Sequence, residues 1–256
     1  MTARLAVVIA DTSQHVLARN ALQHSLRALE AVAPVDQVLV YSDRAEAWPG
    51  LPVQRIDPLT RLAGYNRLIV QRLAEDLRAE HALVIQYDGF VLNAEQFSPH
   101  FRHYDYIGAP WPHFAEMDVG NGGFSWRSRR LVEAAASLPY DGEGVAEDLF
   151  ICRAQRPLLE ARFGLRFAPR AIASHFALES VPVPWPTFGF HGVFHLPTVY
   201  REQIDLLLQH LSPRTMQRWQ AHLRPAFGRV SAAALARFEA QLVALQDAEA
   251  ACTASP

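Results

Sequence analysis

The chain has 256 residues, of which 50% are hydrophobic, so it is long enough for one large α/β domain or for a domain with an appendage. Its formal net charge of −2 excludes nucleic-acid binding that is driven by electrostatics. All 24 basic residues are Arg, which excludes a Schiff-base lysine and the lysine of a P-loop. Any phosphate must therefore be held by Arg, by backbone N–H groups or by a metal.

The longest apolar run near the N-terminus, Leu5 to Ala10, is too short for a membrane span or a secretory signal. Two cysteines, Cys152 and Cys252, give no disulfide framework, so a reducing compartment is the default expectation. We therefore expect a cytoplasmic protein without a transmembrane segment. Peripheral contact with a membrane surface stays open.

Strands and helices alternate in the N-terminal part of the chain. The apolar run Leu5–Ala10 predicts a strand that is buried on both faces, and apolar spacing from Leu17 to Leu29 predicts a helix that ends before Pro34. The next expected elements are strands at 37–41, 53–56 and 82–86 and a helix at 65–77. This alternation favours a doubly wound, mostly parallel sheet that is flanked by helices.

Three aspartates follow predicted strands directly: Asp11, Asp43 and Asp88. The carboxyl ends of parallel strands share one edge of the sheet, and ligands bind outside that edge. We therefore expect a binding site there, with Thr12 beside Asp11. The alternative for Asp11 and Asp43 is a turn-forming Asp that caps the following backbone.

The run Gly120-Asn121-Gly122-Gly123-Phe124-Ser125 predicts a tight turn, because glycine lets the backbone approach a ligand closely. We expect the turn to join a strand to a helix that starts near Arg129. It would form the floor of a cleft, with Gly122 and Gly123 against a ligand. The side chains of Asn121 and Ser125 could then hydrogen-bond to hydroxyl groups.

Four segments occur in the order Gln86-Tyr87-Asp88-Gly89-Phe90, Gly120 to Ser125, Glu147-Asp148 and Phe188-Gly189-Phe190-His191-Gly192. In this order they resemble a nucleotide-sugar-dependent glycosyltransferase of the GT-A fold. The resemblance is to a family of uncharacterised glycosyltransferase-like proteins that carry the same four segments. It covers roughly residues 4–195, and its extension to bacterial cell-surface polysaccharide assembly is by analogy.

The resemblance implies chemical roles for four residues. Asp88 and His191 would hold Mn²⁺ or Mg²⁺ on the diphosphate of the donor, and Asp148 would be the general base of an inverting reaction. Adjacent helical residues point about 100° apart, so Glu147, the second candidate base, would instead cap the helix or pair with an Arg such as Arg153. The alternatives are a hydrogen-bonded structural histidine and two helix-start carboxylates of local importance.

Other candidates would contact the donor or the acceptor. Arg67 and Arg127 are candidates for phosphate or acidic groups, and Tyr87 would contact the donor or the acceptor. Two Trp-Pro segments, around Trp111 and Trp185, could form the wall for a sugar acceptor, because sugar C–H faces pack on aromatic rings. The alternative is that these segments brace loops over the core.

From about residue 198 the composition shifts to helix-forming residues. Leu235, Phe238, Leu242 and Leu245 share one stripe of a predicted helix. We therefore expect a GT-A-like domain at 1–198 and a C-terminal helical appendage at 199–256. The stripe needs burial, against the first domain, a partner or a second copy of the chain.

The sequence thus predicts transfer of a sugar from a nucleotide-sugar donor to a hydroxyl group of a glycan or another acceptor. A departure from the glycosyltransferase pattern supports an alternative, because Asp88 is followed by Gly89 and Phe90 where Asp-x-Asp is common. That alternative is a non-catalytic module that binds a nucleotide sugar or a glycan. Hydrolysis by two opposed carboxylates is a third option, for which no second acid is evident.

Overall fold

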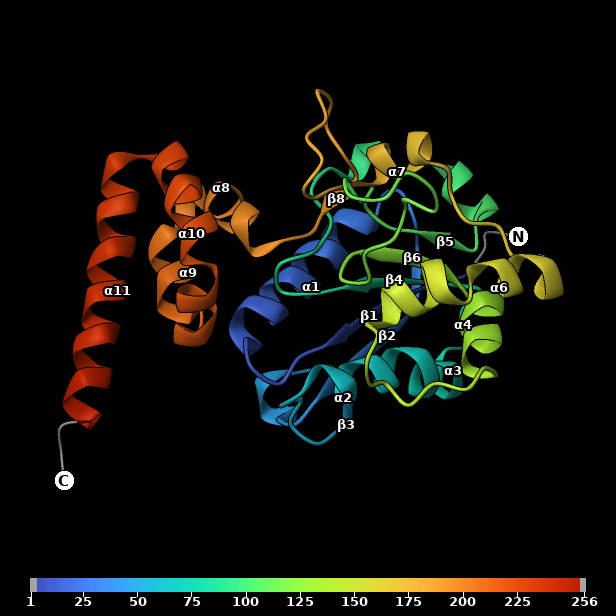
Figure 1. The fold of residues 1–256 in the computed structure, drawn as a ribbon, viewed down its shortest axis with the longest axis horizontal. Coiled ribbons are helices and arrows are strands. Elements are labelled where there is room, and N and C mark those ends of the chain that lie inside the picture. Colours follow the sequence, from blue (N-terminus) through green and yellow to red (C-terminus); the bar gives the residue numbers. More distant parts are fainter. Residues whose placement is uncertain (1–3, 254–256) are drawn as a thin grey trace. The chain divides into compact units, whose positions relative to one another are not determined.

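The computed structural model describes residues 4–253 and the side chains up to Ala248. The chain divides into two units, Met1–His191 and Gly192–Pro256. The first unit contains all the strands, and the second contains helices alone among the residues described (Figure 1).

A six-stranded sheet in the order β3-β2-β1-β4-β6-β5 forms the centre of the first unit. The strands β1 (Leu5–Ala10), β2 (Val35–Ser42), β3 (Val53–Arg55) and β4 (His81–Ile85) are parallel. Strand β6 (Ser125–Ser128) runs antiparallel to β4 and to β5 (Tyr106–Ile107). The predicted mostly parallel α/β sheet is therefore confirmed.

Helices cover both faces of this sheet (Figure 1). Helix α1 (His15–Leu29) follows β1 and packs on it. A continuous helical segment covers the face that carries Ala6 and Val8. It consists of α2 (Leu62–Arg67), a π-helical turn (Leu68–Arg72) and α3 (Leu73–Asp76). Its inward residues are Leu68, Ile69, Leu73 and Leu77, as the apolar spacing predicted.

The glycine-rich run is followed by a strand, and this corrects one expectation. We expected a turn that leads directly into a helix, but Ser125–Ser128 form β6 before α4 (Arg129–Ala136) begins. The Ser128 side chain accepts a hydrogen bond from the Leu131 amide at 3.1 Å and so caps α4. The glycine turn therefore leads into the sheet, at the edge where β4 ends.

The remaining elements of the first unit are short. Three are 3₁₀ turns, at Ala45–Ala47, Ala94–Gln96 and Pro99–His103. The others are α5 (Glu147–Leu149), a π-helical turn (Phe150–Ala154), α6 (Arg156–Phe163), α7 (Arg170–Phe176), β7 (Ala177–Leu178) and β8 (Gly189–Phe190). The strands β7 and β8 pair in parallel. The loop between them returns the chain to the sheet edge at His191.

The second unit is built on a long helical hairpin. It contains α8 (Leu196–Val199), α9 (Ile204–His210), α10 (Pro213–Val230) and α11 (Ala232–Thr253). Phe238 of α11 stacks on Phe227 of α10 at 4.6 Å between ring centroids, and both side chains are fully buried. Leu242 is also buried, so this unit buries much of the predicted stripe internally.

The predicted domain boundary lies between residues 198 and 199, whereas the boundary between the two units of the structure lies between His191 and Gly192. The division into a transferase domain and an appendage stays a prediction. No helix in the described part of the chain is long and apolar enough to cross a membrane. Cys152 is buried and unpaired, and the side chain of Cys252 lies outside the described residues.

Candidate active site

Two of the three strand-end aspartates are joined by a histidine. His15 Nδ1 lies 2.8 Å from Asp11 Oδ2, and His15 Nε2 lies 3.4 Å from Asp43 Oδ1. The Asp11 carboxylate also accepts from the Ser13 amide at 3.2 Å and from the Gln14 amide at 3.0 Å, so it caps the backbone of the turn that precedes α1. The hydrogen bond to Asp11 raises the pKa of His15, with further support from both carboxylate charges and opposition from burial.

Thr12 braces a neighbouring loop. Its hydroxyl accepts a hydrogen bond from the Leu59 amide at 2.9 Å. The loop after β3 is thereby fixed against the end of β1. The expected ligand contacts of Asp11, Thr12 and Asp43 stay predictions.

Asp88 lies in a tight turn at the end of β4. The turn is closed by hydrogen bonds between the backbones of Gln86 and Gly89 at 2.7 and 3.1 Å, and Tyr87 within it is half-buried. Only 9% of Asp88 is exposed, and its Oδ1 atom is buried without a hydrogen-bond partner. Burial raises the pKa of Asp88, while the nearby His191 works in the opposite direction.

His191 connects three segments that lie far apart in the sequence. Its Nδ1 atom is 2.8 Å from Asn121 Nδ2 and 3.3 Å from Glu179 Oε1, and its Nε2 atom is 3.3 Å from Gln86 Oε1. Burial lowers the pKa of His191, but the hydrogen bond to Glu179 and the charges of Asp88 and Glu179 outweigh it and raise that pKa overall.

The glycines of the 120–123 turn make room for protein side chains. A Cβ at Gly120 would meet the Trp111 ring, one at Gly122 would meet the Glu147 carboxylate, and one at Gly123 would meet the His191 ring. These contacts with the protein's own side chains are sufficient to explain why the three positions are glycine. We expected instead that glycine allows a ligand to approach the backbone closely. The turn is instead the point where the protein's own site residues converge.

Asn121 holds this turn in shape. Its φ of 68° is left-handed, a conformation that Asn tolerates better than most residues. Its Oδ1 atom accepts from the Gly123 amide at 3.0 Å, and its Nδ2 group donates to Glu179. Only 4% of Asn121 is exposed, so its side chain stabilises the turn and has little contact with solvent.

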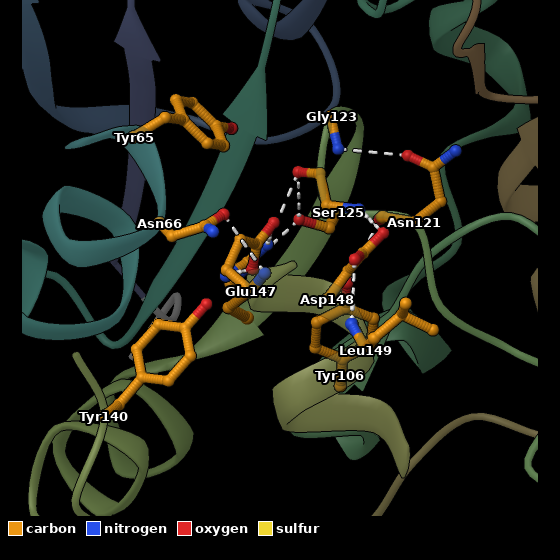
Figure 2. A network of polar contacts seen from close by, with 12 residues as sticks. Tyr65, Asn66, Tyr106, Asn121, Gly123, Ser125, Tyr140, Glu147, Asp148 and Leu149 are labelled. Carbon is orange, nitrogen blue, oxygen red and sulfur yellow. Dashed lines mark hydrogen bonds and ion pairs between the residues drawn. The ribbon is translucent and has the colours of Figure 1, made fainter. Parts of the chain in front are cut away.

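The Glu147 carboxylate is enclosed beside this turn, as Figure 2 shows. It pairs with Arg127, with Arg127 Nη1 3.0 Å from Glu147 Oε2, and only 3% of Glu147 is exposed. The sequence suggested Arg153 as the partner, but Arg153 donates to the Glu116 carbonyl at 2.7 Å. The partner instead comes from β6, because that strand directs Arg127 inward.

Ser125 also differs from expectation. Its side chain is fully buried, its hydroxyl donates to the Gly122 carbonyl at 3.0 Å, and it accepts from Arg127 Nε at 2.9 Å. Both functions of the hydroxyl are therefore used inside the protein, and Ser125 is not placed to bind a sugar. The same burial removes Arg127 as a candidate for direct phosphate contact.

Asp148 has a different environment from its neighbour. It is half-buried, and its Oδ2 atom accepts from the Gly122 amide at 3.3 Å. Its Oδ1 atom accepts from the Leu149 amide at 2.8 Å (Figure 2). Of the Glu-Asp pair, Asp148 is therefore the carboxylate with access to solvent.

Two predicted contact residues lie apart from this cluster, and among the described residues no hydrogen bond joins either of them to it. Arg67 donates to the Asp141 carbonyl at 2.8 Å and lines a groove of about 370 Å³ with Arg61 and Arg72. Trp185 is 40% exposed, and its indole N–H donates to the Ser174 carbonyl at 3.0 Å. Their roles in donor or acceptor binding stay predictions.

The sequence analysis missed three members of the cluster, which are Glu179, Gln86 and Tyr65. Glu179 follows β7 and bonds both Asn121 and His191, while Gln86 Nε2 donates to the Tyr65 hydroxyl at 2.7 Å. The Gln-x-Asp-Gly-Phe segment could have identified Gln86. No sequence signal marks Glu179, whose role depends on the path of the chain.

The residues offer an incomplete site for a divalent cation. The buried, unpartnered Oδ1 atom of Asp88 is a suitable oxygen ligand, and His191 is close enough to affect the pKa of that carboxyl. Within residues 4–248, no three His, Cys, Asp or Glu side chains converge as a metal site. Asp88 thus fits a cation only if a bound ligand and water supply most of the other oxygens.

Residues 52–191 match the model of a family described as "Protein of unknown function (DUF5672)". The match covers more than half of the chain. The chain belongs to this family. The matched region contains Asp88, the glycine turn, the Glu-Asp pair and His191. No curated protein matches the chain in sequence.

The chain is also similar to solved structures at low sequence identity. One is "Mannosyltransferase PcManGT from Pyrobaculum calidifontis in complex with GDP-Man and Mn2+", at 16% identity and a TM-score of 0.45, covering 97% of this chain and 76% of that one. Another is TarS 1-349 from S. aureus, at 13% identity and a TM-score of 0.46, covering 93% and 83%. A third is a glycosyltransferase involved in the glycosylation of the major capsid of PBCV-1, at 11% identity and a TM-score of 0.47, covering 74% of this chain and 92% of that one.

Proposed function

We propose that this protein is a GT-A-type glycosyltransferase that moves a sugar from a nucleotide-sugar donor to a hydroxyl acceptor. The observation that carries the proposal is the cluster at the sheet edge. There the half-buried Asp148 accepts from the Gly122 amide, and the same turn contacts His191, next to Asp88. A solvent-accessible carboxylate suits a general base, and the buried Asp88 carboxylate near it suits a cation that would hold a diphosphate.

In the proposed reaction Asp148 takes the proton of the acceptor hydroxyl. The acceptor oxygen forms a bond to the anomeric carbon of the donor sugar on the face opposite the leaving group. The bond from that carbon to the phosphate oxygen breaks, and the nucleoside diphosphate leaves with the electron pair. One displacement of this kind inverts the anomeric configuration. Hydrogen bonds from the Gly122 and Leu149 amides orient the base.

A divalent cation, Mn²⁺ or Mg²⁺, would be held by Asp88 with His191 beside it. When bound, it would neutralise charge that develops on the leaving diphosphate. Asp11, Asp43 and Thr12 line the edge where the nucleoside would lie. Trp185 and Arg67 are proposed contacts to the acceptor or the donor.

A second candidate function is a module that binds a nucleotide sugar without transfer. The observation that favours it is the absence, among the described residues, of a three-ligand metal cluster around Asp88. Such a module would use the same edge of the sheet, and it would bind the donor without releasing a nucleoside diphosphate.

The experiment has two steps. Thermal shift against a panel of nucleotide sugars, with and without Mn²⁺, selects a donor, because a ligand at about 100 times its Kd stabilises the fold by roughly 2.7 kcal/mol. Release of nucleoside diphosphate is then measured with a set of saccharide acceptors. Acceptor-dependent release supports the transferase. Donor binding without release supports the module, and a panel without any shift rejects both.

A further inference from the structure

Arg127 and Glu147 form the most enclosed ion pair among residues 4–248. Their side chains are 1% and 4% exposed, and they make two contacts, Nη1 to Oε2 at 3.0 Å and Nη2 to Oε1 at 3.1 Å. Removing two charges from water is costly, so such a pair contributes little net stability. Burial works against the charged guanidinium, but Glu147 outweighs it and raises the pKa of Arg127. Burial raises the pKa of Glu147, while the charge and the hydrogen bond of Arg127 oppose that rise, so Arg127 favours the charged form of Glu147.

The pair reaches the glycine turn from two elements. From β6, Arg127 donates to Ser125 Oγ at 2.9 Å and to the Gly122 carbonyl at 3.4 Å. From α5, Glu147 fills the space that a side chain at Gly122 would need. The Glu147 amide also donates to Asn66 Oδ1 at 3.2 Å, which fixes the start of α5. The next residue, Asp148, accepts from the Gly122 amide.

The surroundings keep both charges away from any substrate. Tyr65 is half-buried and its hydroxyl accepts from Gln86, and the Arg127 guanidinium lies 5.3 Å from the centre of the fully buried Tyr106 ring. Tyr65, Tyr106 and Tyr140 surround the carboxylate in Figure 2. Neither Arg127 nor Glu147 can therefore take a proton from an acceptor.

We infer that Arg127 and Glu147 are positioning residues that hold the Gly122 turn and Asp148 in register for transfer. This inference rests on the proposed function for its chemical consequence. Its structural content, that the pair fixes residues 120–124 against 146–149, can be measured without turnover.

The test compares Glu147→Gln, the double variant Arg127→Met/Glu147→Leu and a control double variant, Arg129→Met/Glu133→Leu. The control removes an exposed i,i+4 ion pair of the same composition on α4. Each protein is assayed for kcat, donor KM, melting temperature and the pH dependence of kcat. Hydrogen exchange of segments 119–128 and 146–149 is measured on the same samples.

Glu147→Gln should lower the melting temperature, because it leaves a buried guanidinium without its counter-charge. The apolar double variant should recover stability, since it removes both charges together. Its kcat should nevertheless stay about 10- to 100-fold low, because a small displacement of the base is enough to cost that much. The donor KM of the apolar double variant, and the shape of the pH dependence of its kcat, should remain as in the wild type. The control should match the wild type throughout.

Two kinetic outcomes would overturn the inference. Recovery of kcat together with the melting temperature would make the pair merely structural. If kcat of the wild type falls at acid pH and kcat of Glu147→Gln does not, Glu147 is the proton acceptor.

Hydrogen exchange separates this inference from the proposed function. If the wild type transfers no sugar, the proposed function fails. Faster exchange at 119–128 in the stable double variant would still support the positioning role. Unchanged exchange there would reject it.

Discussion

Glu147 and Asp148 are neighbours in the sequence, but their carboxylates have opposite environments. Glu147 is 3% exposed and is bound to Arg127, whereas Asp148 is half-buried and is held by two backbone amides. A general base must reach the acceptor proton. At the scale of single residues the proposal therefore depends on Asp148.

Asp148→Asn should abolish most of the transfer while donor binding stays nearly unchanged. An amide keeps an oxygen that can accept from the Gly122 amide, but it cannot take a proton. Loss of a general base costs about 10²- to 10⁴-fold in rate. Steady-state kinetics with acceptor, combined with calorimetric titration of the donor, would check this. Near-normal turnover in Asp148→Asn would exclude it as the base.

Asp88 offers one free oxygen, so a cation should bind poorly to the protein alone and tightly with a nucleotide. By reciprocity, the cation should strengthen nucleotide binding by the same factor. We expect Asp88→Asn to abolish this coupling and His191→Ala to weaken it. Calorimetric titration of a nucleoside diphosphate with and without Mn²⁺ measures the coupling in each protein. Equal nucleotide affinity with and without Mn²⁺ in the wild type would rule out the proposed metal.

His15 should make stability depend on pH. Its pKa is raised in the folded protein, so its contribution is fully present below the unfolded value of 6.5 and is lost as pH rises through the folded value. The difference in free energy of unfolding between wild type and His15→Gln should therefore shrink as the pH rises above 6.5. Denaturant titration across that range measures it. A difference that is constant, or that grows with pH, would contradict the assigned contacts to Asp11 and Asp43.

The four motifs predicted residues that the structure brings close together at the sheet edge, but they did not predict the residues that only the folded chain brings there. Asp88, Asn121, Asp148 and His191 meet at one edge because their segments end there. Glu179 could not be predicted, since its bonds depend on how the loop between β7 and β8 turns back. Residue type also gave no indication that Ser125 faces inward.

At the scale of elements, strands β1 to β4 were predictable from the sequence and β6 was not. Strands β1 and β4 are buried along most of their length and are nearly continuous apolar runs, and β2 is buried in its second half, Leu39–Ser42. Strand β6 has the sequence Ser-Trp-Arg-Ser and is entirely buried. Its polar residues are accommodated by Glu147 and by the Gly122 carbonyl, which are contacts that no local pattern records.

The glycine turn should tolerate no side chain at position 123. A Cβ there would meet the His191 ring and Gln86 Oε1, so Gly123→Ala should destabilise the protein by about 1–3 kcal/mol, as overpacking typically does. It should also weaken donor binding, because the ring that would move lies beside Asp88. Gly228→Ala in α10 is the matched control. A Cβ there has ordinary contacts, and replacing a helical glycine should stabilise by about 0.5–1 kcal/mol. Equal stability of the two variants would contradict this packing.

At the scale of the whole molecule, the chain contains two units with separate cores. The sheet and its helices form the first unit. The core of the second unit contains Phe227 and Phe238, which stack on each other in the α10–α11 hairpin. The apolar stripe was predictable from the sequence. The surface against which the stripe packs was not predictable, because helical periodicity shows which face of a helix is buried but does not show which element covers it.

Removal of α11 should expose the core of the second unit. Deletion of residues 228–256 would uncover Leu223 and Phe227, both fully buried, so we expect a lower melting temperature or new self-association. Phe238→Ala isolates the same effect and should cost about 3–5 kcal/mol. Val243→Ala on the same helix is the control and should change little, since Val243 is 53% exposed. Thermal unfolding and light scattering measure both properties. If the truncated protein and Phe238→Ala keep the melting temperature and oligomeric state of the wild type, the α10–α11 core does not contribute to stability as described. If Val243→Ala is as damaging as Phe238→Ala, the exposed face of α11 must be covered in solution, and a second copy of the chain becomes the first partner to test.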